Sequence, residues 1–122
     1  MTTIDLTSDS FSQAVDDNGI LIVDFWAAWC GPCRAFAPVF QAASEAHPDI
    51  TFGKVDTEAE QQLASAAGIS SIPTLMVFRD RILVFSQPGA LSGSQLEQVI
   101  TGVMGLDMDE IRSRMAATAT NT

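Results

Sequence analysis

The 122-residue chain has only two cysteines, a single histidine and no long apolar run, and each scarcity excludes a class of protein or site. Its apolar runs fall short of the ~18 consecutive residues that a membrane-spanning helix needs. Residues 1–5 lack the basic start and apolar stretch of a secretory signal, so we expect a cytoplasmic protein. Because structural zinc takes four Cys or His ligands, such a site would have to be shared between chains.

Positive charge is also scarce. The chain has 6 Lys and Arg against 15 Asp and Glu, a net charge of -9. Nucleic acids and anionic membranes are bound through clustered Lys and Arg, so neither is an expected partner. The length suits one domain, and a hydrophobic content of 47% is sufficient to build its core.

The two cysteines stand close together in the segment Trp29-Cys30-Gly31-Pro32-Cys33. A disulfide between them closes almost no loop and would therefore be a weak structural staple. At the start of a helix, this spacing places the first sulfur over unpaired backbone N–H groups, which stabilise a thiolate. Because the thiolate is the species that attacks a disulfide, the pattern predicts a redox centre with Cys30 as its nucleophile.

Five segments have the composition of β-strands. They are residues 3–6, 20–26, 51–56, 74–79 and 82–87. The second is apolar almost throughout, which is typical of a strand covered on both faces. Asp24 interrupts it, and burial would raise the pKa of this carboxyl, so that it could exchange a proton near neutral pH. The last two segments are joined through Asp80-Arg81 and predict a hairpin.

Four helices are expected between and after these strands, over residues 8–17, 33–47, 57–68 and 92–104. The third begins with the capping-box pattern of Thr57 and Glu60, and the fourth with that of Ser92 and Gln95. The alternation of strands and helices predicts an α/β protein with a central mixed sheet and helices on both faces.

We divide the chain into a domain of residues 1–104 and a C-terminal extension of residues 105–122. In the extension, Asp107 and Glu110 are suited to cap a short extra helix that carries Ile111 and Met115. The small and polar residues 116–122 after it predict a disordered tail.

Five stretches of this sequence, in this order, resemble the bacterial-type thioredoxin family. They are Val23-Asp24-Phe25-Trp26-Ala27-Ala28-Trp29-Cys30-Gly31-Pro32-Cys33, Ala37-Pro38, Lys54-Val55-Asp56, Ser71-Ile72-Pro73-Thr74 and Gly89-Ala90-Leu91-Ser92. The resemblance implies the thioredoxin fold, a central mixed five-stranded sheet flanked by four helices. It also implies a monomer without a bound cofactor that reduces protein disulfides and is recycled by thioredoxin reductase, which draws on NADPH.

The resemblance further assigns roles to individual residues. Cys30 attacks the substrate disulfide to form a mixed disulfide, which Cys33 then resolves. Asp24 matches the buried carboxylate that deprotonates Cys33 through water, and Lys54 matches the lysine that pairs with this carboxylate. The alternative for these two residues is a purely structural ion pair.

The resemblance also implies a substrate-binding surface. Ile72-Pro73 matches the family's cis-proline loop, in which the backbone of Ile72 would hydrogen-bond an extended substrate segment. The whole implied apolar surface consists of Trp29, Gly31, Pro32, Ile72, Pro73, Gly89 and Ala90.

Two other functions stay open on the sequence. The same fold could donate its disulfide as an oxidase or isomerase, although that class usually has a dipeptide other than Gly31-Pro32 between its cysteines. The apolar surface could instead serve a binding subunit in which redox chemistry is incidental. The sequence departs from the family at the hairpin turn, where Asp80-Arg81 stands in place of Asn-Gly or a similar pair.

Overall fold

Strand β2 (Ile20–Trp26) lies at the centre of the fold and pairs with a strand on each side. The computed structural model describes residues 2–120. Its five strands form one sheet in the order β1-β3-β2-β4-β5. The other strands are β1 (Thr3–Asp5), β3 (Thr51–Asp56), β4 (Thr74–Arg79) and β5 (Ile82–Pro88). Strands β1, β3 and β2 are parallel and β4 and β5 run antiparallel, so the prediction of a mixed sheet is confirmed.

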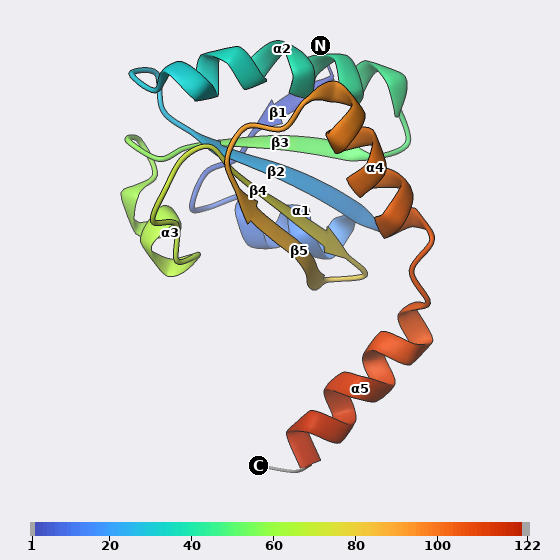
Figure 1. Cartoon of the computed structure of the whole chain (residues 1–122). Helices are drawn as coiled ribbons and strands as arrows, with labels where there is room; N and C mark the ends of the chain where they lie inside the picture. The colour runs from blue at the N-terminus through green and yellow to red at the C-terminus, as the bar shows by residue number, and fades with distance from the viewer. Residues whose placement is uncertain (1, 121–122) are drawn as a thin grey trace.

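Helices cover both faces of this sheet (Figure 1). Helices α2 (Gly31–Ala46) and α4 (Gly93–Met104) pack on one face, and α1 (Phe11–Asp17) and α3 (Gln61–Ala66) on the other. Side chains alternate along a strand, so Ile22 packs under α2 and α4 while Leu21 and Val23 pack under α1 and α3. No helix within residues 2–120 is both long and apolar enough to cross a membrane.

The capping-box prediction for α3 was wrong. The Thr57 hydroxyl donates to the carbonyl oxygen of Trp26 at 3.0 Å, and the Glu60 carboxylate accepts the N–H of Ser8 at 2.8 Å. Both side chains therefore tie α3 to other parts of the chain, and the helix begins only at Gln61.

The capping box of α4 is confirmed. The Ser92 side chain accepts the N–H of Gln95 at 3.1 Å, and the Gln95 side chain accepts the N–H of Ser92 at 2.9 Å. These bonds satisfy two backbone donors at the start of the helix, as expected from the sequence.

The turn between β4 and β5 consists of Asp80 and Arg81, which have φ angles of 52° and 71°. Both residues therefore adopt the left-handed conformation that a two-residue type I′ turn requires and that Asn-Gly adopts more easily. The N–H of Asp80 donates to the carbonyl oxygen of Gly19 at 2.9 Å, which ties the turn to the start of β2. The predicted hairpin is confirmed in spite of its unusual turn residues.

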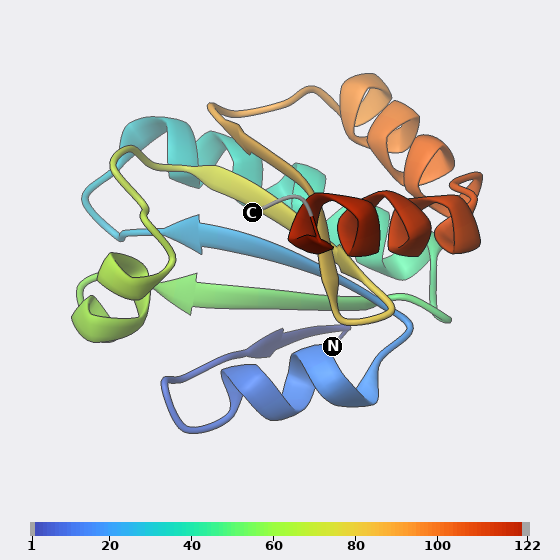
Figure 2. The same ribbon diagram turned by 90° about the horizontal axis from the view of Figure 1, so that it is seen from below.

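The chain has five helices within residues 2–120 rather than the expected four. The fifth, α5 (Met108–Thr120), begins as predicted with Asp107, whose carboxylate accepts the N–H of Glu110 at 3.1 Å. The helix is longer than predicted, because residues 116–120 continue it where we expected a disordered tail. Residues 121–122 of that expected tail lie outside the described part of the chain. Helix α5 projects from the body of the fold (Figure 1) and runs past the β4–β5 hairpin when seen from below (Figure 2).

Candidate active site

The two cysteines lie where the chain passes from β2 into α2, and both are buried. Cys30 is the N-cap residue of α2, and its Sγ accepts the N–H of Cys33 at 3.2 Å. Pro32 stands in the first turn of the helix, where no intrahelical N–H is lost. The two sulfurs form a disulfide, with the Cα atoms 5.2 Å apart. The Cys30 sulfur thus sits at the positive end of α2, the position in which a thiolate is stabilised.

A second loop lies against the disulfide. The Ile72–Pro73 peptide bond is cis, as the resemblance implied. The carbonyl oxygen of Ile72 lies 3.7 Å from the Sγ of Cys30, although the two residues are 42 positions apart. Gly89 joins the same region, because its N–H donates to the carbonyl oxygen of Pro73 at 2.8 Å. Its φ of 100° is one that favours glycine.

A groove of about 450 Å³ runs beside the disulfide. Four of the seven residues predicted to bind substrate line it, namely Trp29, Gly31, Pro32 and Ile72. Of the other three, Pro73 is buried, while Gly89 and Ala90 are exposed but do not line this groove. The Trp29 side chain is 66% exposed and forms the largest open apolar surface at the site.

The far wall of the groove was not foreseen from the sequence. It includes Ala64 of α3 and Ile69 in the loop after that helix. In addition, the indole N–H of Trp29 donates to the Glu58 carboxylate at 2.6 Å, which holds the ring in place. Glu58 lies 29 positions from Trp29, so no local pattern could have indicated this contact. Ser70 and Ser71 also line the groove.

Asp24 lies on the face of β2 that α2 covers, since it alternates in step with Ile22. Its side chain is fully buried, and neither carboxylate oxygen has a hydrogen-bond partner within residues 2–120. Burial raises the pKa of Asp24 from 3.8 to about 6, although the positive charge of Lys54 opposes the shift. A group with this pKa can accept and release a proton near neutral pH.

Lys54 stands beside Asp24 in the β2–β3 pairing, but its ammonium group points elsewhere. The Nζ atom lies 5.0 Å from the centre of the Trp26 ring, a cation–π arrangement. Among the ion pairs of residues 2–120 none joins Lys54 to Asp24, so the lysine acts on the carboxyl through its field rather than by direct contact. Trp26 packs against the small cluster that contains both cysteines.

Metal binding finds no support in the arrangement of side chains. Within the described part of the chain, no group of three or more His, Cys, Asp or Glu residues is placed to hold a metal ion. His47, the only histidine, lies at the end of α2 and pairs with Glu97 of α4 at 2.8 Å. The site is therefore built from two sulfurs, a buried carboxyl and an apolar groove.

Comparison with known proteins agrees with this geometry. The thioredoxin family model matches residues 2–102. The protein named "Putative thioredoxin 2" of Streptomyces coelicolor is 55% identical over 115 residues, which cover 94% of this chain and 86% of that protein. Thioredoxin of Alicyclobacillus acidocaldarius is 41% identical over 84% of this chain and 98% of its own length. A solved thioredoxin structure from Plasmodium falciparum matches with a TM-score of 0.76 and 32% identity, over 82% of this chain and 97% of that one. The chain therefore belongs to the thioredoxin family.

Proposed function

We propose that the chain, a protein-disulfide oxidoreductase by its family, reduces disulfides in substrate proteins with Cys30 as nucleophile and Cys33 as resolving residue. The observation that carries the proposal is the position of the Cys30 sulfur at the N-cap of α2, where it accepts the Cys33 N–H at 3.2 Å. The same donor and the positive end of the helix stabilise a thiolate on Cys30 in the reduced protein.

The reaction begins when the Cys30 thiolate attacks one sulfur of the substrate disulfide. A mixed disulfide forms, and the other substrate sulfur leaves as a thiolate that takes up a proton. Cys33 then loses its proton and attacks the Cys30 sulfur, which releases the second substrate sulfur and forms the Cys30–Cys33 disulfide. Two electrons pass to the substrate. The second attack is intramolecular, so little encounter entropy opposes it.

Asp24 is the proton acceptor for Cys33 in this scheme. Its support is a buried position under the helix that carries Cys33 and a pKa raised to about 6, which suits proton transfer near neutral pH. Lys54 adjusts that pKa downward through its charge. The Trp26 ring, which contacts both the lysine and the cysteine cluster, is a positioning residue.

Substrate docks as an extended segment across the groove beside the disulfide. The Ile72 backbone lies next to the Cys30 sulfur and can pair with such a segment, while Trp29, Gly31 and Pro32 offer apolar contact. Gly89, which a hydrogen bond to Pro73 holds against the same loop, and its neighbour Ala90 are both exposed and leave room for a substrate backbone to approach. Because these contacts are mostly with backbone and apolar groups, the groove accepts many different substrate proteins.

Electrons return to the Cys30–Cys33 disulfide from thioredoxin reductase and NADPH. Thioredoxins in general interact with this reductase and with disulfide substrates, and the groove lined by Cys30 is the surface on which we expect both to dock. The proposed location is the cytoplasm, where thiols are kept reduced.

The reduction potential of the Cys30–Cys33 couple tests the proposal. Equilibration in graded thiol–disulfide buffers should give a potential more reducing than the cytosolic glutathione pool. A potential well on the oxidising side would instead assign the chain to the disulfide donors or isomerases.

Trapping experiments test the order of the two cysteines. Cys33→Ser should accumulate a mixed disulfide with a model protein substrate, because the resolving thiol is missing. Cys30→Ser, the matched control, should form none and should lose turnover. A Cys30→Ser variant with full partner function would favour the binding-subunit alternative.

A further inference from the structure

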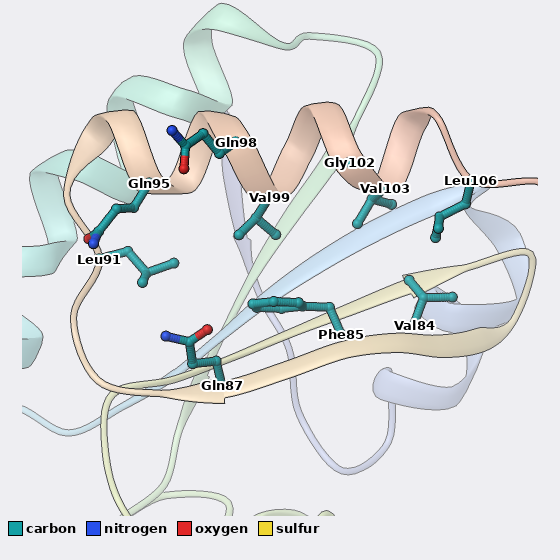
Figure 3. A pocket seen from close by; sticks show the side chains of 10 residues that line it. All are labelled: Val84, Phe85, Gln87, Leu91, Gln95, Gln98, Val99, Gly102, Val103 and Leu106. Atoms are coloured by element: carbon teal, nitrogen blue, oxygen red, sulfur yellow. The ribbon is translucent and has the colours of Figure 1, made fainter.

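A second groove, similar in size to the one beside the disulfide, lies between β5 and α4 (Figure 3). Its volume is about 480 Å³, against about 450 Å³ beside the disulfide. No charged residue lines either groove. Beside the disulfide, however, the lining side chain of Trp29 bonds to the carboxylate of Glu58, which does not itself line the groove. The two grooves therefore differ in that a carboxylate acts on one wall of the first.

The Trp29 ring has few other contacts that fix it. Its side chain is 66% exposed, so packing covers only a minor part of its surface. No ring pair or cation–π contact of residues 2–120 includes Trp29. The indole N–H donates to Oε1 of Glu58 at 2.6 Å, and hydrogen bonds to an ionised acceptor are short and strong. This bond is therefore the main restraint on rotation of the ring.

The backbone that carries Trp29 is fixed separately. Nη1 of Arg34 donates to the carbonyl oxygen of Ala28 at 2.8 Å, which ties the loop to the first turn of α2. The N–H of Cys30 donates to the carbonyl oxygen of Ala27 at 3.2 Å and closes the turn that contains Trp29. With the loop held in this way, the freedom left to Trp29 is rotation about its side-chain bonds, which is the motion that Glu58 opposes.

The backbone of Glu58 is anchored as well. Oδ1 of Asp56 accepts the N–H of Glu58 at 3.0 Å and the N–H of Ala59 at 3.4 Å. The N–H of Thr57 donates to the carbonyl oxygen of Trp26 at 2.9 Å, where β2 ends. The segment before α3 is thus joined to the sheet, so that the Glu58 carboxylate is a fixed point for the ring.

We propose that Glu58 is a positioning residue that sets the preference of this chain for protein disulfides over small disulfides. The proposal rests on the function proposed above, in which Trp29 offers apolar contact to an extended substrate segment. Glu58 acts through the Trp29 ring rather than on the cysteines, so the sulfur chemistry is the same for both kinds of substrate.

The physical basis is the conformational entropy of the Trp29 side chain. A side chain that moves freely in the unbound protein loses this freedom when a partner orders it, and the loss weakens binding. A ring that Glu58 has already ordered loses little more. A protein substrate that lies on the ring gains from this preorganisation, whereas a small disulfide has no chain to lie there and gains nothing. The rate of reduction should therefore depend on Glu58 for protein substrates alone.

The test compares two second-order rate constants of the pre-reduced chain, one for a denatured protein with a single disulfide and one for hydroxyethyl disulfide. Glu58→Ala should slow reduction of the protein by about threefold to tenfold, the range expected for one side chain that must be ordered at docking. Reduction of hydroxyethyl disulfide should not change. Glu58→Gln should restore the parent rate for the protein, because its amide oxygen also accepts the indole N–H.

The matched control is Glu45→Ala. Glu45 is also an exposed glutamate that accepts a side-chain hydrogen bond, from Gln41 at 3.2 Å, but it lies near the far end of α2. Its loss should leave both rates unchanged. The proposal is overturned if Glu58→Ala slows neither reaction, or slows both alike. It is also overturned if Glu58→Gln slows reduction of the protein as much as Glu58→Ala does, since the charge and not the hydrogen bond would then matter.

Nuclear magnetic resonance of the indole N–H groups tests the positioning without any reaction. The order parameter of the Trp29 indole should fall in Glu58→Ala and stay high in Glu58→Gln, with Trp26 as the internal reference. An unchanged order parameter in Glu58→Ala overturns the proposal even when the parent chain reduces disulfides. A parent chain that reduces neither substrate would instead overturn the proposed function, and the order parameters would still decide whether Glu58 positions Trp29.

Discussion

Replacing Asp24 with asparagine is expected to stabilise the protein at neutral and alkaline pH. The substitution keeps the size and the polar character of the side chain but removes its ionisation. The Asp24 side chain is fully buried, and burial raises its pKa to about 6 in the folded protein, against 3.8 as its ordinary value. The folded state therefore binds the Asp24 proton more tightly than the unfolded state does.

The size of the effect follows from the two pKa values. A difference of about two units corresponds to about 3 kcal/mol, at 1.36 kcal/mol per unit. Because the folded pKa is the higher one, this contribution to stability is fully present below pH 3.8 and is lost as the pH rises through about 6. Above that pH, folding of the parent protein buries an ionised carboxylate, whereas folding of the asparagine variant buries a neutral side chain.

The assay is urea unfolding of the oxidised parent and variant at several pH values from about 3 to about 8. The free energy of unfolding of the variant, relative to the parent, should increase by about 3 kcal/mol from the acidic to the alkaline end. Asp49→Asn, at an exposed position, is the matched control and should show no such trend. Parallel profiles for the Asp24 variant and the parent would refute the reasoning, because they would mean that burial does not raise the pKa of this carboxyl.

Three further substitutions test the packing and the turns by equilibrium unfolding. Arg81→Gly should raise the free energy of unfolding by about 0.5 to 1 kcal/mol, because φ at this position is 71°; a loss of stability would contradict the strain inferred for the turn. Gly53→Ala should lower the free energy of unfolding by about 1 to 3 kcal/mol, since a Cβ there would overlap the buried side chain of Leu6. When Leu6→Ala is added to the same chain, the loss for the double variant should be less than the sum of the two single losses. Ser92→Ala should lower the free energy of unfolding by about 1 kcal/mol, because the N-cap hydrogen bond of α4 is lost, whereas Ser94→Ala nearby should change this free energy little. Equal effects of the two substitutions would argue against the cap.

Local patterns were sufficient wherever the interacting groups are close in the sequence. Strands β2, β3 and β4 have the bounds that their apolar runs predicted. The Ser92–Gln95 capping box formed because both partners lie within one turn of helix. The same pattern at Thr57 and Glu60 failed, since β2 and the loop after β1 supplied partners that no local signal reveals. A hydrogen bond predicted from a local pattern therefore forms only when no distant group binds the same side chains.

The C-terminal helix was underestimated for a different reason. Residues 116–120 carry alanine and threonine without apolar periodicity, so hydrophobic spacing gave no signal there. Alanine nevertheless has the highest helix propensity of all residues, which allows α5 to continue once Asp107 has started it. Apolar periodicity indicates that one side of a helix is buried, and a helix that projects from the domain buries little of its surface.

The sequence by itself determined the chemistry of this protein, because the spacing of Cys30 and Cys33 at a helix start is a property of four consecutive residues. Only the tertiary structure decided what surrounds that chemistry. The strand order places the Ile72 carbonyl beside the Cys30 sulfur across 42 positions, the Glu58 carboxylate on the Trp29 ring, and the ammonium of Lys54 over Trp26 rather than on Asp24. The raised pKa of Asp24 also belongs to the fold, since it results from the packing that removes water from the carboxyl.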